Sequence, residues 1–402
     1  MSKAVKLFLT FIIAFSFTPS AFSKVKLVTH KISLDDGRKF TLKLPGNYEI
    51  IPAAQRLRRP RFLAQAPDGR YFVTDMFDMT DNKKGTVYNL GRINKKTGRL
   101  GKPRPFLTGL HNPNSVAFYT DSKKRIWFYV AETHKLTRYR YRVNRNKVFG
   151  RPQVLARFPA YGQEYKYGGW HLTRTIAVGT NGKIYVSIGS SCNSCEEKES
   201  ERDLRAVVLE MNPDGSERRV FARNVRNAVG LKWINNALYA TVQGVDHLGL
   251  HRPDDTFHVL KDGMDYGWAK CVQQNGSMVF DETYAVEGQE NPDCRKFPAS
   301  PIYFAAHSSA MGFDYFGEFA DKPLRNSFLV ALHGSTSRAD RRGYQIVIAR
   351  KGKKHEVFVD TFRKKKRIVG RPCDIVRVSD YSFLFTDDNA GVVYYVRKRG
   401  AL

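Results

Sequence analysis

Four side chains that can bind anions or move a proton stand just before apolar segments that share one pattern. They are His171, Arg226, Asn227 and Arg371. A neutral imidazole accepts a proton near pH 7, whereas a guanidinium stays protonated and offers a planar set of N–H donors to carboxylates. If the fold gathers these residues, they form a cationic pocket with one base, which suits an anionic ligand and proton abstraction.

The apolar segments belong to a repeat that runs along the chain. Each copy contains an apolar strand, a polar turn and a second strand that ends in small or acidic residues, and a third strand follows. The copies lie at 62–75, 116–132, 175–189, 229–242, 312–332 and 374–387. Short antiparallel strands that recur in this way are typical of a β-propeller, so we predict an all-β chain with six four-stranded blades. The inner strands of such blades surround a channel, and the four side chains would lie at one mouth of it.

The last copy of the repeat has no outer strand at the C-terminal end of the chain. A propeller has to close its ring, because an open strand edge is a pairing hazard. We expect residues 39–44 to supply the missing strand.

The composition fits an exported globular protein. Of the 402 residues, 42% are hydrophobic and 26% are charged, which excludes a wholly disordered chain, collagen and a coiled coil. Residues 1–23 resemble a secretory signal peptide, because basic residues precede an apolar stretch at 7–17 and small residues stand at the cleavage positions. The alternative is an uncleaved anchor. We predict cleavage near Ser23, a periplasmic or secreted protein without a transmembrane segment, and a single propeller domain over residues 24–402.

Export makes the five cysteines interpretable, because disulfides persist in oxidising compartments. Cys271 and Cys294 flank an insertion before the fifth repeat copy, and we predict that they form a disulfide. Cys192 and Cys195 form either a tight disulfide or half of a zinc site, although the sequence has no second C-x-x-C pair. Cys373 is left unpaired.

The charge is strongly positive, with 67 Lys and Arg against 38 Asp and Glu, a net charge of +29. Basic runs occur at 56–61 and 363–367, among other places. Export argues against nucleic acid as the partner despite this charge. We expect a solvated basic surface that can contact anionic components of the cell envelope.

In order along the chain, several short motifs resemble those of the soluble sugar dehydrogenases that depend on pyrroloquinoline quinone (PQQ). The resemblance covers roughly residues 55–397 and is strongest to the branch of L-sorbosone and aldose sugar dehydrogenases. The motifs are WHLTR at 170–174, YVSIGSSCNSCEE at 185–197, RN at 226–227, YGWAKC at 266–271, AHSSAMG at 306–312, ALHGS at 331–335 with Arg338, GY at 343–344, GRP at 370–372 and TDDNAGV at 386–392. Each motif alone is unspecific, but the ordered series is specific.

The resemblance implies roles for the four side chains that open the repeat copies. His171 corresponds to the catalytic base of the family, and Arg226 corresponds to the arginine that polarises the reacting quinone oxygen. Asn227 and Arg371 correspond to cofactor contacts. PQQ is planar and carries three carboxylates, so bidentate arginine contacts suit it.

Further cofactor and metal positions follow from the same resemblance. It assigns His333 and Arg338 to the cofactor, with His333 standing where the glucose-oxidising branch has a lysine. It also implies a Ca²⁺ ion near Gly244 and Val245, which would offer backbone carbonyls. Asp246 is a nearby carboxylate, and hard oxygen ligands suit calcium.

The implied reaction is the oxidation of a small-molecule sugar or sugar aldehyde by hydride transfer to the quinone, with an electron acceptor that the sequence does not identify. His111 and Asn114, before the second repeat copy, are candidates for substrate contact. Two other functions stay open. One is a propeller lactonase, which needs carboxylates and amides around a channel metal. The other is a non-catalytic propeller that binds a ligand or a protein.

Overall fold

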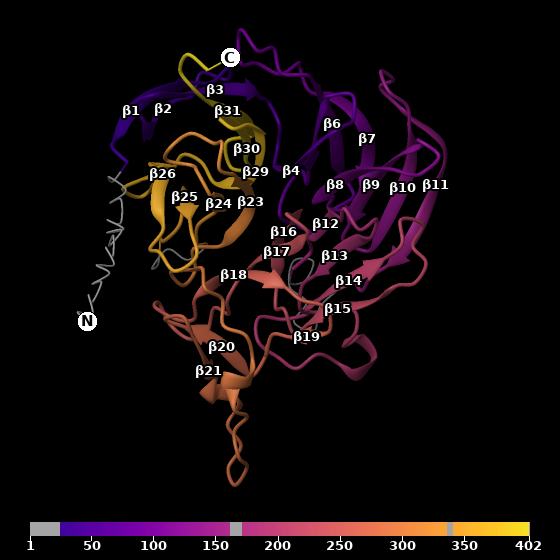
Figure 1. Cartoon of the computed structure of the whole chain (residues 1–402), viewed down its shortest axis with the longest axis vertical. Coiled ribbons are helices and arrows are strands. Elements are labelled where there is room, and N and C mark those ends of the chain that lie inside the picture. Colours follow the sequence, from indigo (N-terminus) through magenta and orange to yellow (C-terminus); the bar gives the residue numbers. More distant parts are fainter. Residues whose placement is uncertain (1–24, 161–170, 336–340, 402) are drawn as a thin grey trace, which may run out of the picture.

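Six small sheets surround a common axis in the computed structural model, which describes residues 25–160, 171–335 and 341–401 (Figure 1). Five of these sheets have four antiparallel strands. The sixth sheet, which begins with Arg174–Val178, has a fifth strand that runs parallel to its neighbour. The predicted signal peptide at 1–23 lies outside the described residues. None of the helices in the described ranges is long and apolar enough to cross a membrane.

The six sheets are numbered as blades 1 to 6, and the strands of each blade follow one another from the inner strand to the outer strand. Blade 1 contains β4 (Pro60–Gln65), β5 (Tyr71–Asp75), β6 (Gly85–Gly91) and β7 (Arg104–Leu110), and blade 2 contains β8 (Ser115–Thr120), β9 (Ile126–Glu132), β10 (Lys135–Tyr141) and β11 (Val148–Arg157). Blade 3 contains β12 (Arg174–Val178), β13 (Ile184–Ile188), β14 (Val207–Met211), β15 (Arg219–Arg223) and β19 (Met264–Asp265). Blade 4 contains β16 (Ala228–Ile234), β17 (Ala237–Val242), β18 (Asp255–Leu260) and β22 (Tyr303–Phe304), and blade 5 contains β23 (Ala310–Phe316), β24 (Ser327–Leu332), β25 (Gln345–Ala349) and β26 (Glu356–Val359). Blade 6 contains β29 (Pro372–Ser379), β30 (Ser382–Asp387), β31 (Val392–Lys398) and β3 (Tyr48–Ala54).

The remaining elements lie outside the blades. They are the hairpins β1 (Leu27–Ser33) with β2 (Lys39–Pro45), β20 (Cys271–Gln274) with β21 (Ser277–Phe280) and β27 (Arg363–Lys364) with β28 (Arg367–Ile368), and the 3₁₀ turns η1 (Glu199–Glu201), η2 (Glu282–Tyr284) and η3 (Cys294–Lys296).

The inner strands form a closed ring, which confirms the predicted six-bladed propeller. Strands β4, β8, β12, β16, β23 and β29 contact one another in this order, and β29 contacts β4. The middle strands β13 and β14 are buried along their whole length, because neighbouring blades cover both of their faces. This is why they are continuous apolar runs without an exposed polar face. The outer strand β11 is mostly exposed.

The ring is closed by a different segment from the one expected. Strand β3 pairs with β31 in an antiparallel register that runs from Tyr48 opposite Lys398 to Ala54 opposite Val393. The expected segment 39–44 instead belongs to β2, which pairs with β1. The prediction was wrong because β2 packs its apolar face elsewhere: Leu42 and Leu44 are fully buried in the core shared by blades 5 and 6.

The cysteine predictions are confirmed in the described residues. Cys271 is bonded to Cys294, and Cys192 is bonded to Cys195. The second bond removes the zinc alternative, because zinc binds thiolates and these two sulfur atoms are bonded to each other. Cys373 is a free and buried thiol.

Candidate functional site

A cavity of about 590 Å³ lies where several inner strands begin. Its walls come from the residues that precede or open β4, β12, β16 and β23, and from the loops after β5, β17 and β24. The lining residues are Arg61, Met76, Met79, 171–173, Arg226, Asn227, Val229, Gln243, Gly244, Asp246, Gly249, Leu250, Asp255, His307, Ser309, Met311 and 333–335. Four inner strands each add one residue to a buried apolar cluster of Phe62, Val229, Met311 and Cys373. Side chains therefore fill the channel beside the cavity.

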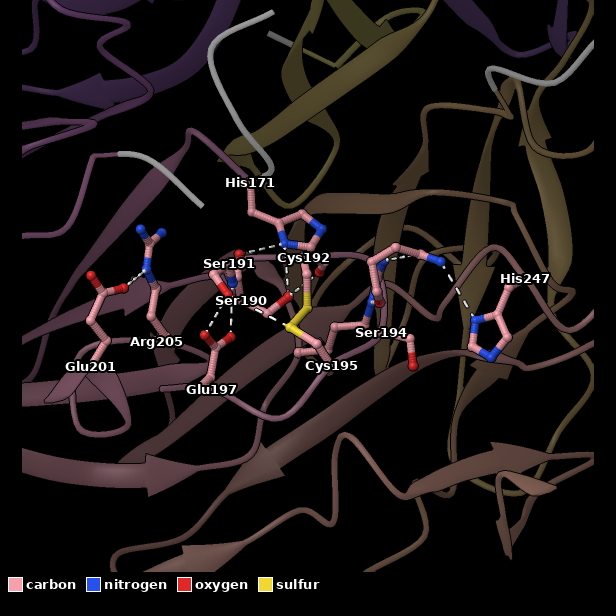
Figure 2. Close-up of a disulfide and its surroundings, with 12 residues drawn as sticks. His171, Ser190, Ser191, Cys192, Ser194, Cys195, Glu197, Glu201, Arg205 and His247 are labelled. Carbon is pink, nitrogen blue, oxygen red and sulfur yellow. Dashed lines mark hydrogen bonds and ion pairs between the residues drawn. A yellow bond between two sulfur atoms is a disulfide. The ribbon is translucent and has the colours of Figure 1, made fainter. Parts of the chain in front are cut away.

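The surroundings of His171 determine which ring nitrogen carries the proton. Nδ1 lies 3.0 Å from both the backbone oxygen and the hydroxyl of Ser190 (Figure 2). The Ser190 hydroxyl donates to the carbonyl of Cys192 at 2.8 Å, so it faces His171 as an acceptor. Nδ1 is therefore the protonated nitrogen, and Nε2 carries the lone pair. Burial and the charge of Arg226 hold the pKa of His171 well below its usual range, so the imidazole is neutral at neutral pH.

A glycine allows His171 and Asn227 to approach each other. A Cβ atom at Gly189 would lie 2.6 Å from both the Cβ of His171 and the Oδ1 of Asn227, so only glycine fits at this position. Asn227 donates from Nδ2 to Oε1 of Gln243 at 3.0 Å, and Gln243 donates to the hydroxyl of Ser309 at 2.7 Å. This chain of hydrogen bonds fixes the amide groups along the cavity wall.

The guanidinium of Arg226 is buried and is held by uncharged oxygen atoms. Nε donates to the carbonyl of Asn193 at 2.9 Å, Nη2 donates to Oδ1 of the same residue at 2.8 Å, and Nη1 donates to the carbonyl of Gln243 at 3.2 Å. Burial lowers the pKa of Arg226 to about 10, so the group stays charged at neutral pH. A buried charge whose direct partners are neutral attracts an anionic ligand.

The predicted calcium segment reaches the cavity in part. Gly244 and Asp246 line it, whereas the side chain of Val245 is buried in an apolar cluster with Cys192 and Trp268. The backbone N–H of Gly244 donates to the carboxylate of Asp255 at 2.9 Å, and Asp255 also lines the cavity. Burial raises the pKa of Asp255 to about 6.

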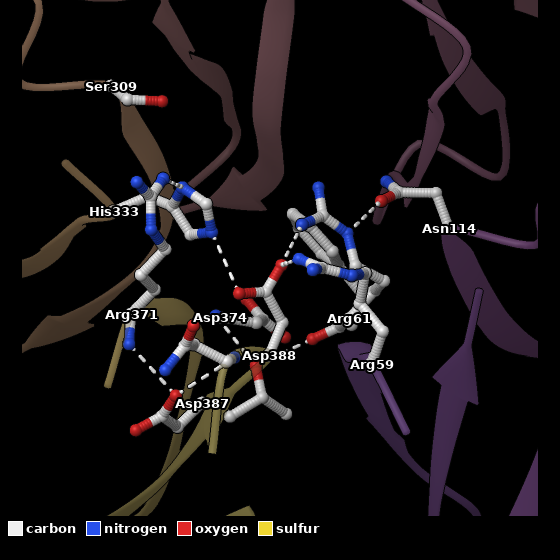
Figure 3. Close-up of polar contacts among 12 residues, drawn as sticks. Arg59, Arg61, Asn114, Ser309, His333, Arg371, Asp374, Asp387 and Asp388 are labelled. Carbon is white, nitrogen blue, oxygen red and sulfur yellow. Dashed lines mark hydrogen bonds and ion pairs between the residues drawn. The ribbon is translucent and has the colours of Figure 1, made fainter. Parts of the chain in front are cut away.

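A second polar cluster lies across the ring, on blades 1, 5 and 6. The buried carboxylate of Asp388 accepts hydrogen bonds from Arg61 at 2.7 Å, from His333 Nε2 at 2.8 Å and from Arg59 at 3.2 Å (Figure 3). Burial by itself raises the pKa of Asp388, but His333 and Arg61 more than offset this and hold it below its usual value. The positive charge of Arg61 is thus compensated within the protein.

Arg371 belongs to the same cluster but does not line the cavity. Nη1 donates to Nδ1 of His333 at 3.3 Å, which makes His333 a neutral ring with its proton on Nε2. The guanidinium also donates to the carbonyls of Gly334 at 3.1 Å and Ser335 at 2.9 Å. Arg371 therefore supports three residues of the wall without lining the cavity itself.

Comparison of the sequence with known proteins does not identify a family. No protein-family model matches the sequence. An uncharacterized protein of Borreliella burgdorferi is 26% identical over 377 residues, which cover 89% of this chain and 90% of that protein.

Solved structures of sugar dehydrogenases and of a carbohydrate-active enzyme have the same fold. The holo form of the PQQ domain of pyranose dehydrogenase from Coprinopsis cinerea has a TM-score of 0.69 at 14% identity, over 89% of this chain and 97% of that one. A calcium structure of a Trichoderma reesei carbohydrate-active enzyme of family AA12 has a TM-score of 0.70 at 14% identity, over 94% and 99%. The PQQ-bound aldose sugar dehydrogenase of Streptomyces coelicolor has a TM-score of 0.59 at 17% identity, over 88% and 99%. At these identities, the likeness shows the fold alone.

The structure gathers most of the predicted site residues and separates others. His171, Arg226, Asn227, Gly244, Asp246 and His333 line one cavity. Arg371 was expected to face the ligand, but it is bound to the carbonyls of the wall. Arg338 lies outside the described residues.

The two substrate candidates differ in position. His111 is turned toward Asp81 and His134 and is absent from the cavity wall. Asn114 lies inside the ring, where it accepts from Nε of Arg61 at 3.2 Å and donates to the hydroxyl of Thr175 at 3.0 Å.

Sequence reasoning missed four residues that the structure adds to the site. They are Arg61, Asn193, Gln243 and Asp255. Arg61 carried a usable signal, because it directly precedes the first repeat copy in the same way that Arg226 and Arg371 stand close before theirs. Asn193, Gln243 and Asp255 carried none, because their roles depend on contacts between blades or loops distant in sequence.

Proposed function

We propose that this chain is a PQQ-dependent dehydrogenase that oxidises a sugar or sugar aldehyde after export to the periplasm. One observation carries the proposal: a neutral His171 with its lone pair on Nε2 lines the same cavity as Arg226, whose direct hydrogen-bond partners are uncharged. The fold supports it, because the sugar-oxidising enzymes of Coprinopsis cinerea and Streptomyces coelicolor share this propeller.

The donor groups fit a planar tricarboxylate such as PQQ. Three hydrogen bonds occupy Arg226, so two of its five N–H groups remain for a ligand. Arg226 and Asn227 would hold the cofactor on one side, and Arg61 and His333 would face it from the other. Arg338 remains a predicted contact, and Arg371 would act through His333, Gly334 and Ser335, which it supports. The cavity volume lies within the usual range for small-molecule sites.

A calcium ion would be held near residues 244–246. Asp246 and Asp255 supply carboxylate oxygens on this wall, and the carbonyls of Gly244 and Val245 would add hard ligands. Among the described residues, no group of three acidic, histidine or cysteine side chains gathers at this loop. The ion therefore needs backbone oxygens and the anionic cofactor to complete its ligand set.

The residues of the chain have distinct parts in this reaction. Bound PQQ would supply the hydride acceptor. His171 takes the proton of the substrate hydroxyl on Nε2 while Ser190 holds Nδ1–H and keeps the ring in position. Arg226 stabilises negative charge that develops on the ligand oxygen beside it, because the buried guanidinium is preorganised by Asn193 and Gln243.

Cofactor reconstitution tests the proposal. The purified apoprotein is titrated with PQQ in the presence of Ca²⁺ and again with a chelator, and dye reduction is measured with a panel of aldoses and sugar aldehydes. We expect saturable PQQ binding that needs Ca²⁺ and dye reduction that needs PQQ. Hydrolysis of lactones by the PQQ-free protein, or no PQQ binding at all, would contradict the proposal.

A further inference from the structure

The loop closed by the Cys192–Cys195 disulfide touches both of the residues proposed to do the chemistry. It follows β13 directly and lies beside His171 (Figure 2). It also contacts Arg226 through Asn193. The hydrogen bonds of this loop form two separate contacts, one through Ser190 and one through Asn193.

The first contact fixes His171. Ser190 presents two oxygen atoms to Nδ1, and its hydroxyl is aimed as an acceptor because it donates to the carbonyl of Cys192. The orientation of the Ser190 hydroxyl thus depends on a residue of the disulfide. The backbone N–H of Ser190 donates to the carbonyl of Arg226 at 2.8 Å, which ties the two catalytic segments together.

The second contact fixes Arg226. Asn193, the residue after Cys192, accepts two hydrogen bonds from the guanidinium, one on its carbonyl and one on Oδ1. The same Oδ1 accepts the backbone N–H of Asp246 at 3.0 Å. One side chain therefore sets the direction of the arginine and the position of the proposed calcium loop.

The loop is anchored on its far side. Cys192 is fully buried and packs with Val245, Trp268 and Val272. Glu197 accepts from the backbone N–H of Ser191 at 2.8 Å and from its hydroxyl at 2.6 Å.

A purely stabilising cross-link would be better placed elsewhere. The Cys192–Cys195 bond joins residues only 3 positions apart, against 23 for Cys271–Cys294. In the chain-entropy model, the shorter loop constrains the unfolded chain less. The contribution of the short disulfide therefore lies mainly in the shape that it gives to residues 190–195.

We propose that this disulfide-closed loop is the positioning device of the site: Ser190 sets the tautomer of His171, Asn193 sets the direction of Arg226, and the Cys192–Cys195 bond holds both in place. The inference rests on the proposed function of the cavity. Cys192, Cys195 and Asn193 are positioning residues and do not react.

Two variants and one matched control test the device. Cys192→Ala with Cys195→Ala opens the loop, and Asn193→Ala keeps the disulfide but removes the Oδ1 acceptor. Cys271→Ala with Cys294→Ala is the control, because it removes the other disulfide while keeping the contacts of Ser190 and Asn193.

The first measurement is hydrogen exchange of the apoprotein, which needs no cofactor. Opening the loop should speed exchange at Ser190 and Asp246 by at least about tenfold, because both amides are bonded through it. Asn193→Ala should speed exchange at Asp246 alone. The control should leave both amides unchanged.

The second measurement is PQQ affinity and turnover. Each of the two loop variants should weaken PQQ binding about tenfold, as expected for one misplaced charged contact. At saturating PQQ, kcat should fall while the substrate KM stays within about twofold, since the substrate pocket itself is unchanged.

The outcomes separate this proposal from the proposed function. If the wild-type protein binds no PQQ, the function is wrong, and the exchange measurements alone still decide the positioning role. If exchange at Ser190 and Asp246 is unchanged in the opened loop, or rises equally in the control, the loop is not the positioning device.

Discussion

The two polar sides of the cavity differ in the direct partners of their buried arginine. On the His171 side, formed by His171, Arg226 and Asn227, the buried guanidinium donates hydrogen bonds only to carbonyl and amide oxygens, and the carboxylates of Asp246 and Asp255 act on it without a direct bond. On the Asp388 side, formed by Arg61, His333 and Asp388, a buried carboxylate compensates the arginine.

The difference shows that a buried arginine by itself does not mark a ligand site. A compensated arginine contributes mainly to the structure of the wall, because its charge is already paired within the protein. An arginine held by neutral dipoles keeps its charge available and so is suited to bind an anion. This division between a chemical side and a structural side can be tested by substitutions, from the largest expected effect to the smallest.

Replacing the base should have the largest effect. His171→Asn keeps a polar side chain of similar size but removes the proton acceptor, so substrate-dependent reduction of bound PQQ should slow by about 10²–10⁴. Stopped-flow absorbance of reduced PQQ measures the step. His355→Asn is a matched control, since His355 packs on Phe304 away from the cavity. A rate within tenfold of wild type would remove His171 from the mechanism.

Breaking the compensated network should affect stability most. Asp388→Asn leaves Arg61 buried without its counter-charge, so the free energy of unfolding should fall by about 3–5 kcal/mol. Urea denaturation measures this. The exposed pair of Arg377 and Asp380 provides the control, because Asp380→Asn should cost less than about 1 kcal/mol.

The same network predicts a dependence of stability on pH. The folded-state pKa of Asp388 is lower than its unfolded value, so the folded state binds fewer protons and the contribution is present above about pH 4. It is lost as the pH falls below that value. The gap in stability between wild type and Asp388→Asn should therefore narrow on acidification; a constant gap would show that the carboxylate charge is unimportant.

Removing Arg226, which has no carboxylate among its direct hydrogen-bond partners, should affect binding more than stability. Arg226→Ala should weaken PQQ binding by about 10- to 100-fold, the range for a hydrogen bond to a charged group. Since the charge of Arg226 also lowers the pKa of His171, the variant should raise that pKa. Histidine NMR of the apoprotein measures the shift. If the pKa of His171 and the affinity for PQQ are both unchanged, Arg226 contributes to the structure of the wall and not to ligand binding.

Arg371 should give the smallest effect. Its guanidinium donates hydrogen bonds to Gly334, Ser335 and His333 and does not line the cavity. Because its effect on the ligand is indirect, Arg371→Ala should weaken PQQ binding by less than about tenfold. Equilibrium dialysis measures the affinity of Arg371→Ala and Arg226→Ala for PQQ under the same conditions, and the two losses rank the arginines. A larger loss than that of Arg226→Ala would reverse the assignment of the two sides.

Much of this protein follows from its sequence. The recurrence of short apolar strands with polar turns determines the six blades, because each such unit can bury its faces only against its neighbours. The position of His171 and Arg226 just before the third and fourth repeat copies predicted that they would share one mouth, since equivalent positions in a ring lie at the same level. The Cys271–Cys294 disulfide was also predicted, because both cysteines flank the insertion in an exported chain, whereas the Cys192–Cys195 bond was one of two alternatives.

Only the tertiary structure decided which strand closes the ring and which arginines are paired directly with a carboxylate. Both β2 and β3 have strand patterns, and the choice fell to β3 because Leu42 and Leu44 of β2 are needed in the core of blades 5 and 6. The pairing of Arg61 with Asp388 joins residues 327 positions apart, and the bond from Arg226 to Asn193 joins residues 33 apart. No local pattern encodes such contacts, because electrostatic compensation depends on distance in space and on burial rather than on distance along the chain.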